Sequence, residues 1–147
     1  MYVPGMPKII VFLGTVSLIL LYILLFYAGY LVFWPTKSLV VNNPIMKVDT
    51  PVVKRGDALI YDFNYCRYDI FGATIYRTVY GDNNIIYLLA AVNTVTYPGC
   101  RNVKIYLMIP ATIPPGTYHV EMLVNVQVNL LKVISVQSRT NDFQVTN

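Results

Sequence analysis

The pattern of apolar and polar positions divides the chain into two unlike parts. From Ile9 to Trp34, no charged residue, histidine, side-chain amide or proline interrupts the apolar sequence. As a helix, these roughly 26 residues would be about 39 Å long, against about 30 Å for the hydrocarbon core of a bilayer. We therefore predict a transmembrane helix at residues 9–34, preceded by a short N-terminal flank at residues 1–8.

Two other interpretations of the apolar segment fit less well. A cleaved signal peptide would have a shorter apolar region and a cleavage site with small residues, and no such site follows Trp34. A helix buried in a soluble protein would need a domain large enough to surround it, and about 100 further residues are too few. The basic flanks, with Lys8 before the helix and Lys37 after it, are almost balanced. We expect the N-terminus inside and the C-terminal part outside.

The end of the apolar segment has residues typical of a membrane–water interface. Tyr30 and Trp34 carry amphipathic rings, and Lys37 marks the return to water after Pro35. We therefore predict that Tyr30, Trp34 and Lys37 lie at the interface and that the anchor contacts membrane lipid.

Polar and apolar residues alternate with period two from Val52 onward, which predicts strands rather than helices. Residues 35–51 contain three prolines and an Asn-Asn-Pro turn signal, and we expect a linker there. Alternatively, residues 38–41 pair as an edge strand. The expected strands cover 59–66, 73–80, 85–97, 103–109, 118–128, 132–137 and 142–145. About seven strands without a helical period between them predict a mainly β domain at residues 52–147, an antiparallel β-sandwich.

One local motif narrows this expectation. The sequence Pro115-Gly116-Thr117-Tyr118 opens the penultimate long strand after a proline-rich turn. It resembles the tyrosine corner of immunoglobulin-like and fibronectin type III-like sandwiches, with Tyr118 as the corner residue. The chain departs from antibody-type domains because its single tryptophan lies in the apolar segment and because Val120 stands where such domains have a cysteine. It is also similar to small single-pass proteins of bacteria and phages.

The two cysteines are candidates for a disulfide. In an immunoglobulin-like topology, the strand that ends at Cys66 and the strand that begins at Cys100 are antiparallel neighbours, and these ends meet. Both cysteines also fall on the outward parity of their strands, so the resemblance allows the bond. A disulfide implies an oxidising compartment, and thus an extracytoplasmic domain. The alternative is two free thiols in a cytosolic domain.

Charge and motifs point away from several function classes. The net charge of +4 is spread out along the chain, which disfavours a nucleic-acid partner. The single histidine, His119, shares a strand face with Glu121, and two polar residues on a wet face explain the pair better than a catalytic dyad does. No phosphate-binding, nucleophile-elbow or Cys/His metal motif is present in the sequence. We therefore expect no enzyme activity, no cofactor, no metal site and no small-molecule substrate.

An apolar surface is the most informative remaining feature. Residues 85–92 are apolar at both parities, although one face of a strand in a small sandwich meets water. Ile86 and Leu88 would then point outward, and Leu123 lies on the outward parity of its own strand. We predict an interaction surface at these three residues. The alternative is a bulge that turns part of residues 85–92 inward.

These features favour a membrane-anchored structural or interaction protein that assembles with copies of itself or with other subunits outside the cytoplasm. A pilin-like filament subunit also joins an apolar N-terminal helix to a β-domain, but the prepilin-type cleavage site and the acidic residue near the start of the helix are missing. An accessory subunit of a membrane or viral complex is the third hypothesis.

Overall fold

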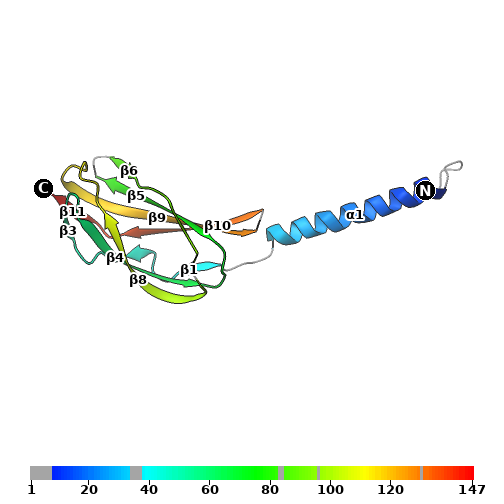
Figure 1. The fold of residues 1–147 in the computed structure, drawn as a ribbon, viewed down its shortest axis with the longest axis horizontal. Coiled ribbons are helices and arrows are strands. Elements are labelled where there is room, and N and C mark those ends of the chain that lie inside the picture. Colours follow the sequence, from blue (N-terminus) through cyan, green and yellow to red (C-terminus); the bar gives the residue numbers. More distant parts are fainter. Residues whose placement is uncertain (1–7, 34–37, 83–84, 96, 130) are drawn as a thin grey trace. The chain divides into compact units, whose positions relative to one another are not determined.

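A computed structural model describes residues 8–33, 38–82, 85–95, 97–129 and 131–147. The chain separates into two compact units, Met1–Pro35 and Thr36–Asn147, and each is described by itself. The described residues of the first unit form one helix. The second unit, which we call the head, contains strands and no helix among its described residues (Figure 1).

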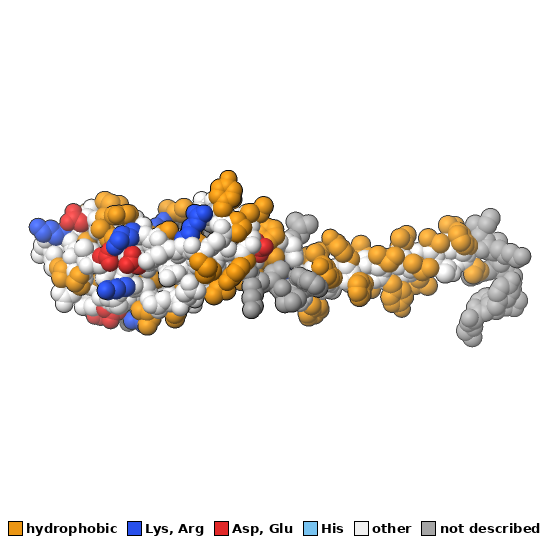
Figure 2. Space-filling model, turned by 90° about the horizontal axis from the view of Figure 1, so that it is seen from below, with side chains coloured by type: hydrophobic (Ala, Val, Ile, Leu, Met, Phe, Trp, Pro, Cys, Tyr) orange, Lys and Arg blue, Asp and Glu red, His pale blue; other side chains and the backbone are white. Residues whose placement is uncertain are grey.

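The helix α1 (Lys8–Phe33) has 26 residues and begins one position before the predicted segment. Within it, Ile10–Phe33 has a mean hydropathy of 2.5 and none of its most apolar window is buried. Apolar side chains cover the face of α1 seen in Figure 2. By length and composition, α1 is able to cross a membrane. Tyr30 lies in its last turns, whereas Trp34 and Lys37 lie outside the described residues.

The head contains eleven strands among the described residues, arranged in two sheets. The count exceeds the roughly seven predicted from periodicity because residues 39–54 contribute three short strands and residues 85–97 form two strands in place of one. The strands are β1 (Leu39–Val41), β2 (Ile45–Met46), β3 (Val52–Lys54), β4 (Ala58–Arg67), β5 (Ala73–Gly81), β6 (Ile86–Leu88), β7 (Val92–Thr94), β8 (Gly99–Met108), β9 (Gly116–Asn129), β10 (Lys132–Thr140) and β11 (Phe143–Thr146).

The smaller sheet, sheet A, has the strand order β1–β4–β8. The antiparallel pair β4–β8 extends from Ala58 opposite Met108 to Arg67 opposite Gly99. On the other side of β4, β1 pairs antiparallel with its last residues, from Tyr65 to Arg67. Residues 35–51, expected to be a linker, therefore contain strands that belong to the sheets, in line with the edge strand considered for residues 38–41.

The larger sheet, sheet B, is built around β9, the longest strand. One side of β9 pairs antiparallel with β5, and the other side pairs with β10 and then β11. Two short strands extend the sheet in parallel, β2 beside β10 and β3 beside β11, where an all-antiparallel sandwich was expected. On the far side of β5 lie β6 and β7.

The core lies between the two sheets, as the alternation predicted. From sheet A, Leu59 and Tyr61 are fully buried, and from sheet B, Val120 and Met122 are fully buried. Burying each aliphatic side chain of this size contributes roughly 1.5–3 kcal/mol relative to leaving it in water. The packing of these two inward faces fixes which side chains of each sheet point outward.

One inward position in sheet B carries a charge. Arg77 shares its parity on β5 with the buried residues Ala73 and Val79. The positive charge of its guanidinium lowers the pKa of the Tyr61 hydroxyl, which belongs to the opposite sheet. Burial raises the pKa of Tyr61 to about 12, and the nearby Arg77 charge opposes this rise only in part.

Residues 85–97, predicted as one strand, form two. β6 and β7 both pair with β5, opposite Tyr80–Thr78 and Ile75–Ala73 respectively, and the chain leaves the ladder between them. The amide of Leu89 donates to the carbonyl oxygen of Arg77 at the break (3.0 Å). The interruption resembles the bulge considered as the alternative, and Tyr87 and Leu89 pack against the core.

Candidate functional site

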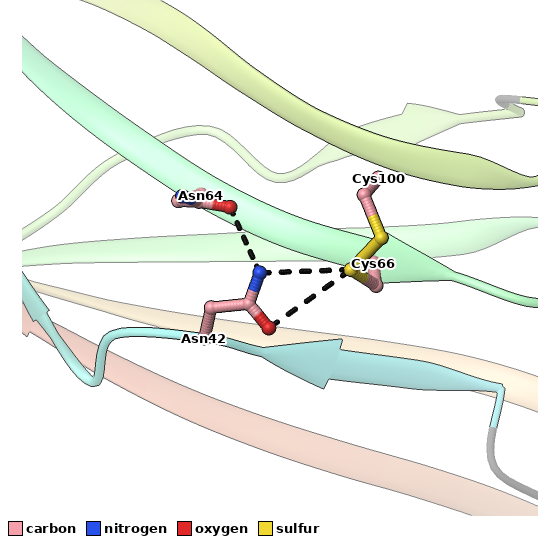
Figure 3. Close-up of a disulfide and its surroundings, with 4 residues drawn as sticks. All are labelled: Asn42, Asn64, Cys66 and Cys100. Carbon is pink, nitrogen blue, oxygen red and sulfur yellow. Dashed lines mark hydrogen bonds between the residues drawn. A yellow bond between two sulfur atoms is a disulfide. The ribbon is translucent and has the colours of Figure 1, made fainter.

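The outward face of sheet A contains the disulfide Cys66–Cys100, shown in Figure 3. The two residues are directly opposite in the β4–β8 register, with their Cα atoms 3.9 Å apart. The side-chain amide of Asn42 donates to Oδ1 of Asn64 (3.0 Å) and to Sγ of Cys66 (3.5 Å). Cys66 is buried beneath this contact, whereas Cys100 is exposed.

The polar side chains that continue this face are bonded to one another. Lys104 forms ion pairs with Asp49 and with Asp62, the latter at 3.6 Å. The hydrogen bond from Lys104 to Asp49 is the main reason why the pKa of Lys104 lies above its ordinary value. Because these groups satisfy each other, the middle of the face offers few polar side chains to another molecule.

The outward face of sheet B carries the three residues predicted as an interaction surface. Ile86 and Leu88 lie beside each other on β6, with 56% and 82% of their surface exposed. Leu123 on β9 is 37% exposed and pairs with Tyr76 of the intervening strand β5. The structure therefore places the three predicted interaction residues on one face, two strand spacings or about 10 Å apart across the sheet. We call Ile86, Leu88 and Leu123 the apolar patch.

Two hollows indent this same face. The larger has a volume of about 550 Å³ and lies over the start of β5 and the end of β9. The smaller, of about 240 Å³, lies between β5 and β10, over Glu121 and Leu123. The ring of Tyr76 lines both hollows.

His119 stands at the other end of this face, between two carboxylates. Its Nε2 lies 3.9 Å from Oε1 of Glu121, and its Nδ1 lies 3.9 Å from Oδ1 of Asp142. The ring stacks on Tyr80 with centroids 5.4 Å apart. Since the carboxylates flank different ring nitrogens, they do not converge on one position beside the imidazole. Within the described residues, no group of three or more His, Cys, Asp or Glu side chains is arranged to hold a metal ion.

Tyr118, the predicted corner residue, lies at the start of β9. Its hydroxyl donates to the carbonyl oxygen of Pro114, four residues upstream (2.8 Å). The ring lies against Gly81, where an added Cβ would come within 2.5 Å of Cε1 of Tyr118. A side chain at position 81 is therefore incompatible with this placement of the ring, which fixes the end of β5 against β9.

The sequence did not identify the larger hollow. Its lining includes the outward residues Asn93, Asn125 and Gln127, which by pattern alone are ordinary polar residues of a wet sheet face. One sequence feature could have suggested the hollow: these amide side chains and the tyrosine Tyr76 all fall on the outward parity of their strands. Only the pairing of β5 with both β7 and β9 brings these side chains together.

Comparison with protein-family models and with curated proteins yields no match. Among solved structures, the chain is similar to the Pseudomonas fluorescens alkylpurine DNA glycosylase AlkC bound to DNA containing an abasic site analog, with 11% identity and a TM-score of 0.45. That match covers 77% of this chain and 32% of the glycosylase, so the chain spans about a third of its length.

The chain is also similar to a structure that describes T cell specificity and activation by the bacterial superantigen toxic shock syndrome toxin-1. The identity is 10% and the TM-score 0.33, and the match covers 69% of this chain and 97% of that chain.

The first comparison corrects one expectation from the sequence. We expected the chain not to be an enzyme, and an enzyme, the glycosylase, is among its structural neighbours. The non-enzymatic assignment is therefore withdrawn. At 11% identity and a TM-score of 0.45, the likeness carries no inference about which activity the chain would have.

Proposed function

We propose that this protein is a single-pass membrane subunit whose head lies outside the cytoplasm and assembles with protein neighbours through the apolar patch. The anchor would be α1, with its uncharged stretch Ile10–Phe33. The disulfide Cys66–Cys100 supports an extracytoplasmic head, because such bonds persist in oxidising compartments. Tyr30, Trp34 and Lys37 would mark the membrane–water interface and contact lipid headgroups.

We also propose that the head is an immunoglobulin-like sandwich. Its strand order supports this, since β4 pairs with β8 in one sheet while β9 lies between β5 and β10 in the other. Immunoglobulin-like domains divide their strands in this manner, with the corner tyrosine near the start of the strand that β9 would represent. The hydrogen bond from Tyr118 to Pro114 supports the same assignment.

The exposure of the apolar patch is the single observation that carries the assembly proposal. Leu88 keeps 82% of its surface exposed on a short edge strand, next to the exposed Ile86. Removing apolar surface of this kind from water favours association by about 25 cal/mol per Å². The three patch residues are uncharged, and Glu121, which lies across β5 from Leu88, accepts a hydrogen bond from Gln137 (3.2 Å). We expect a second copy to be the first partner, because anchoring in one membrane concentrates identical heads.

Native mass measurement of the full chain in mild detergent or nanodiscs tests this proposal. We expect the wild type to give an oligomer and Leu88→Glu to shift the population toward monomer at least tenfold, because a carboxylate would have to be desolvated at the contact. Met108→Glu is the matched control. Met108 is 64% exposed on sheet A, so the same change there should leave the oligomer intact.

Three outcomes are informative. A monomer for both the wild type and Leu88→Glu, without co-purifying chains, would contradict the assembly proposal. A co-purifying protein that is lost only in Leu88→Glu would replace the second copy with another subunit and support the accessory-subunit alternative. N-terminal sequencing addresses the pilin-like alternative, because an intact Met1 excludes processing before α1.

A further inference from the structure

The larger hollow on sheet B combines features that the apolar patch does not use. Its volume of about 550 Å³ falls within the roughly 300–1,000 Å³ range of small-molecule sites. Side chains from four strands line it, including Thr74, Tyr76, Asn93, Asn125, Gln127 and Val133. None of the lining residues carries a formal charge, so the hollow suits a neutral ligand.

The polar groups of the hollow are amides and hydroxyls, which both donate and accept hydrogen bonds. The hydroxyl of Thr74 donates to Oδ1 of Asn93 (2.9 Å), which holds that amide in place across the β5–β7 ladder. Oδ1 of Asn125 is buried and has no hydrogen-bond partner within the described residues. Leaving a buried acceptor unpaired is unfavourable, so a turn of the Asn125 side chain that brings Oδ1 to a ligand hydroxyl would gain a hydrogen bond.

An aromatic ring completes the lining. Tyr76 lies on β5 directly across from Leu123 and keeps 45% of its surface exposed. An exposed tyrosine ring beside amide side chains offers an apolar face next to hydrogen-bonding groups. Pyranose rings have matching chemistry, since their C–H faces stack on aromatic rings while their hydroxyls bond to amides.

We propose that the larger hollow binds a neutral saccharide, with Tyr76 as the stacking platform and Asn93, Asn125 and Gln127 as the hydrogen-bonding groups. A peptide fits less well. The backbone groups of β5 and β9 beneath the hollow are already paired in the sheet, so a peptide would find no main-chain ladder there. Anionic ligands such as nucleotides lack a cationic partner among the lining residues.

This inference goes beyond the assembly proposal and does not depend on it. It concerns a bound ligand and implies no chemical reaction, so it leaves open whether the chain acts on any substrate. The same sugar chemistry would come from a soluble glycan or from the headgroup of a neutral glycolipid. The two sources require separate arms in the experiment.

The experiment uses the full chain in phosphatidylcholine nanodiscs. The soluble probes are chitotriose, maltotriose and cellotriose at millimolar concentration, observed by saturation-transfer NMR. The lipid arm compares nanodiscs with and without digalactosyl diacylglycerol. N-acetyl-tetraalanine amide and inorganic phosphate serve as the peptide and anion probes. We expect at least one saccharide probe, soluble or lipid-borne, to bind and to shift the amide signals of Asn125 and Gln127.

Variants assign the binding to the hollow. We expect Tyr76→Ala and Asn125→Ala each to weaken saccharide binding about fivefold or more, consistent with the loss of one stacking or hydrogen-bonding contact. Tyr106→Ala and Asn102→Ala are the matched controls, because both residues are exposed on sheet A, and they should bind as the wild type does. Leu88→Glu should also retain binding, which separates this proposal from the assembly proposal.

The shifts of the wild-type signals do not require any variant to fold, so the proposal stays testable if a substitution unfolds the head. Absence of binding for every saccharide in both arms would overturn it. So would saccharide binding that shifts only signals outside the hollow, or that Tyr76→Ala and Asn125→Ala leave unchanged in folded protein. Preferential binding of the peptide or of phosphate would overturn it in favour of those ligands.

Discussion

The outward faces of the two sheets differ in how their polar groups are satisfied. On sheet A, Lys104 pairs with two aspartates, and Asn42 bonds to Asn64 beside the disulfide. On sheet B, Oδ1 of Asn125 is buried without a partner in the described part of the chain, and apolar side chains stand exposed nearby. A face whose groups bond to one another stabilises the fold, whereas a face with unused groups is available for binding.

Among the changes that test this difference between the faces, removing the disulfide should cause the largest loss of stability. The bond closes a separation of 34 residues, so Cys66→Ser combined with Cys100→Ser should lower the free energy of unfolding by about 3–4 kcal/mol. Urea denaturation measures the loss, and reductant should reproduce it in the wild type but not in the double variant. Native-state hydrogen exchange sharpens the comparison, since protection should fall more in β8 than in β9. An equal fall in protection in both strands would mean that the disulfide stabilises the two sheets equally.

Alkaline pH tests the packing between the faces. Unfolded Tyr61 ionises near pH 10 and folded Tyr61 at about 12, so the unfolded state binds fewer protons between these values. The contribution of Tyr61 to the free energy of unfolding should therefore be fully present below pH 10. It should fall by roughly 2–3 kcal/mol as the pH rises to 12. Tyr61→Phe should abolish this part of the slope, measured by denaturation across pH. Tyr106→Phe, at an exposed site, should retain it.

A smaller effect is expected at the corner that joins β9 to β5. Tyr118→Phe removes the hydroxyl that donates to Pro114 and keeps the ring against Gly81, so we expect a loss of about 1 kcal/mol. Thermal or urea denaturation measures it. Tyr97→Phe is the control, because Tyr97 is largely exposed. Equal stabilities for Tyr118→Phe and the wild type would show that the hydroxyl does not contribute to the fold of sheet B.

The smallest effect should come from the ion pairs of sheet A. Asp49→Asn removes the main cause of the raised pKa of Lys104, so that pKa should move down toward its ordinary value. Asp62→Asn should produce a weaker change in the same direction. NMR titration of the Lys104 side chain measures both, and added salt should reduce them because the amine is exposed to solvent. If neither substitution changes the pKa of Lys104, the ion pairs do not distinguish the outward face of sheet A from that of sheet B.

The sequence predicted the elements whose pattern follows from burial. Alternation from Tyr118 to Val128 identified β9, since one face packs on the core and the other meets water. The immunoglobulin-like resemblance brought the strand ends that carry Cys66 and Cys100 together, their shared parity put both on one face, and the structure contains the disulfide. The break between β6 and β7 was not predicted as such, because residues 85–92 are apolar throughout and the interruption arises from pairing with β5.

The larger hollow could not be predicted for a related reason. Asn93, Asn125 and Gln127 lie on different strands, and period-two alternation only indicates that each points outward. Whether outward residues form a flat surface or a hollow depends on the curvature of the sheet and on neighbours such as Val133 of β10. Candidate binding residues on a sheet face therefore need the strand register as well as the pattern.

The position of the disulfide has a mechanical consequence. The chain enters the head through β1, whose Val40 lies opposite Cys66, and the disulfide carries that contact directly to β8. In the membrane-anchored subunit that we propose, tension on the chain before β1 would load the β1–β4 hydrogen bonds and spread into two covalently joined strands. We expect a higher rupture force with the disulfide oxidised than reduced in single-molecule pulling. In such a subunit, the crosslink would protect the head at the strand through which the chain enters it.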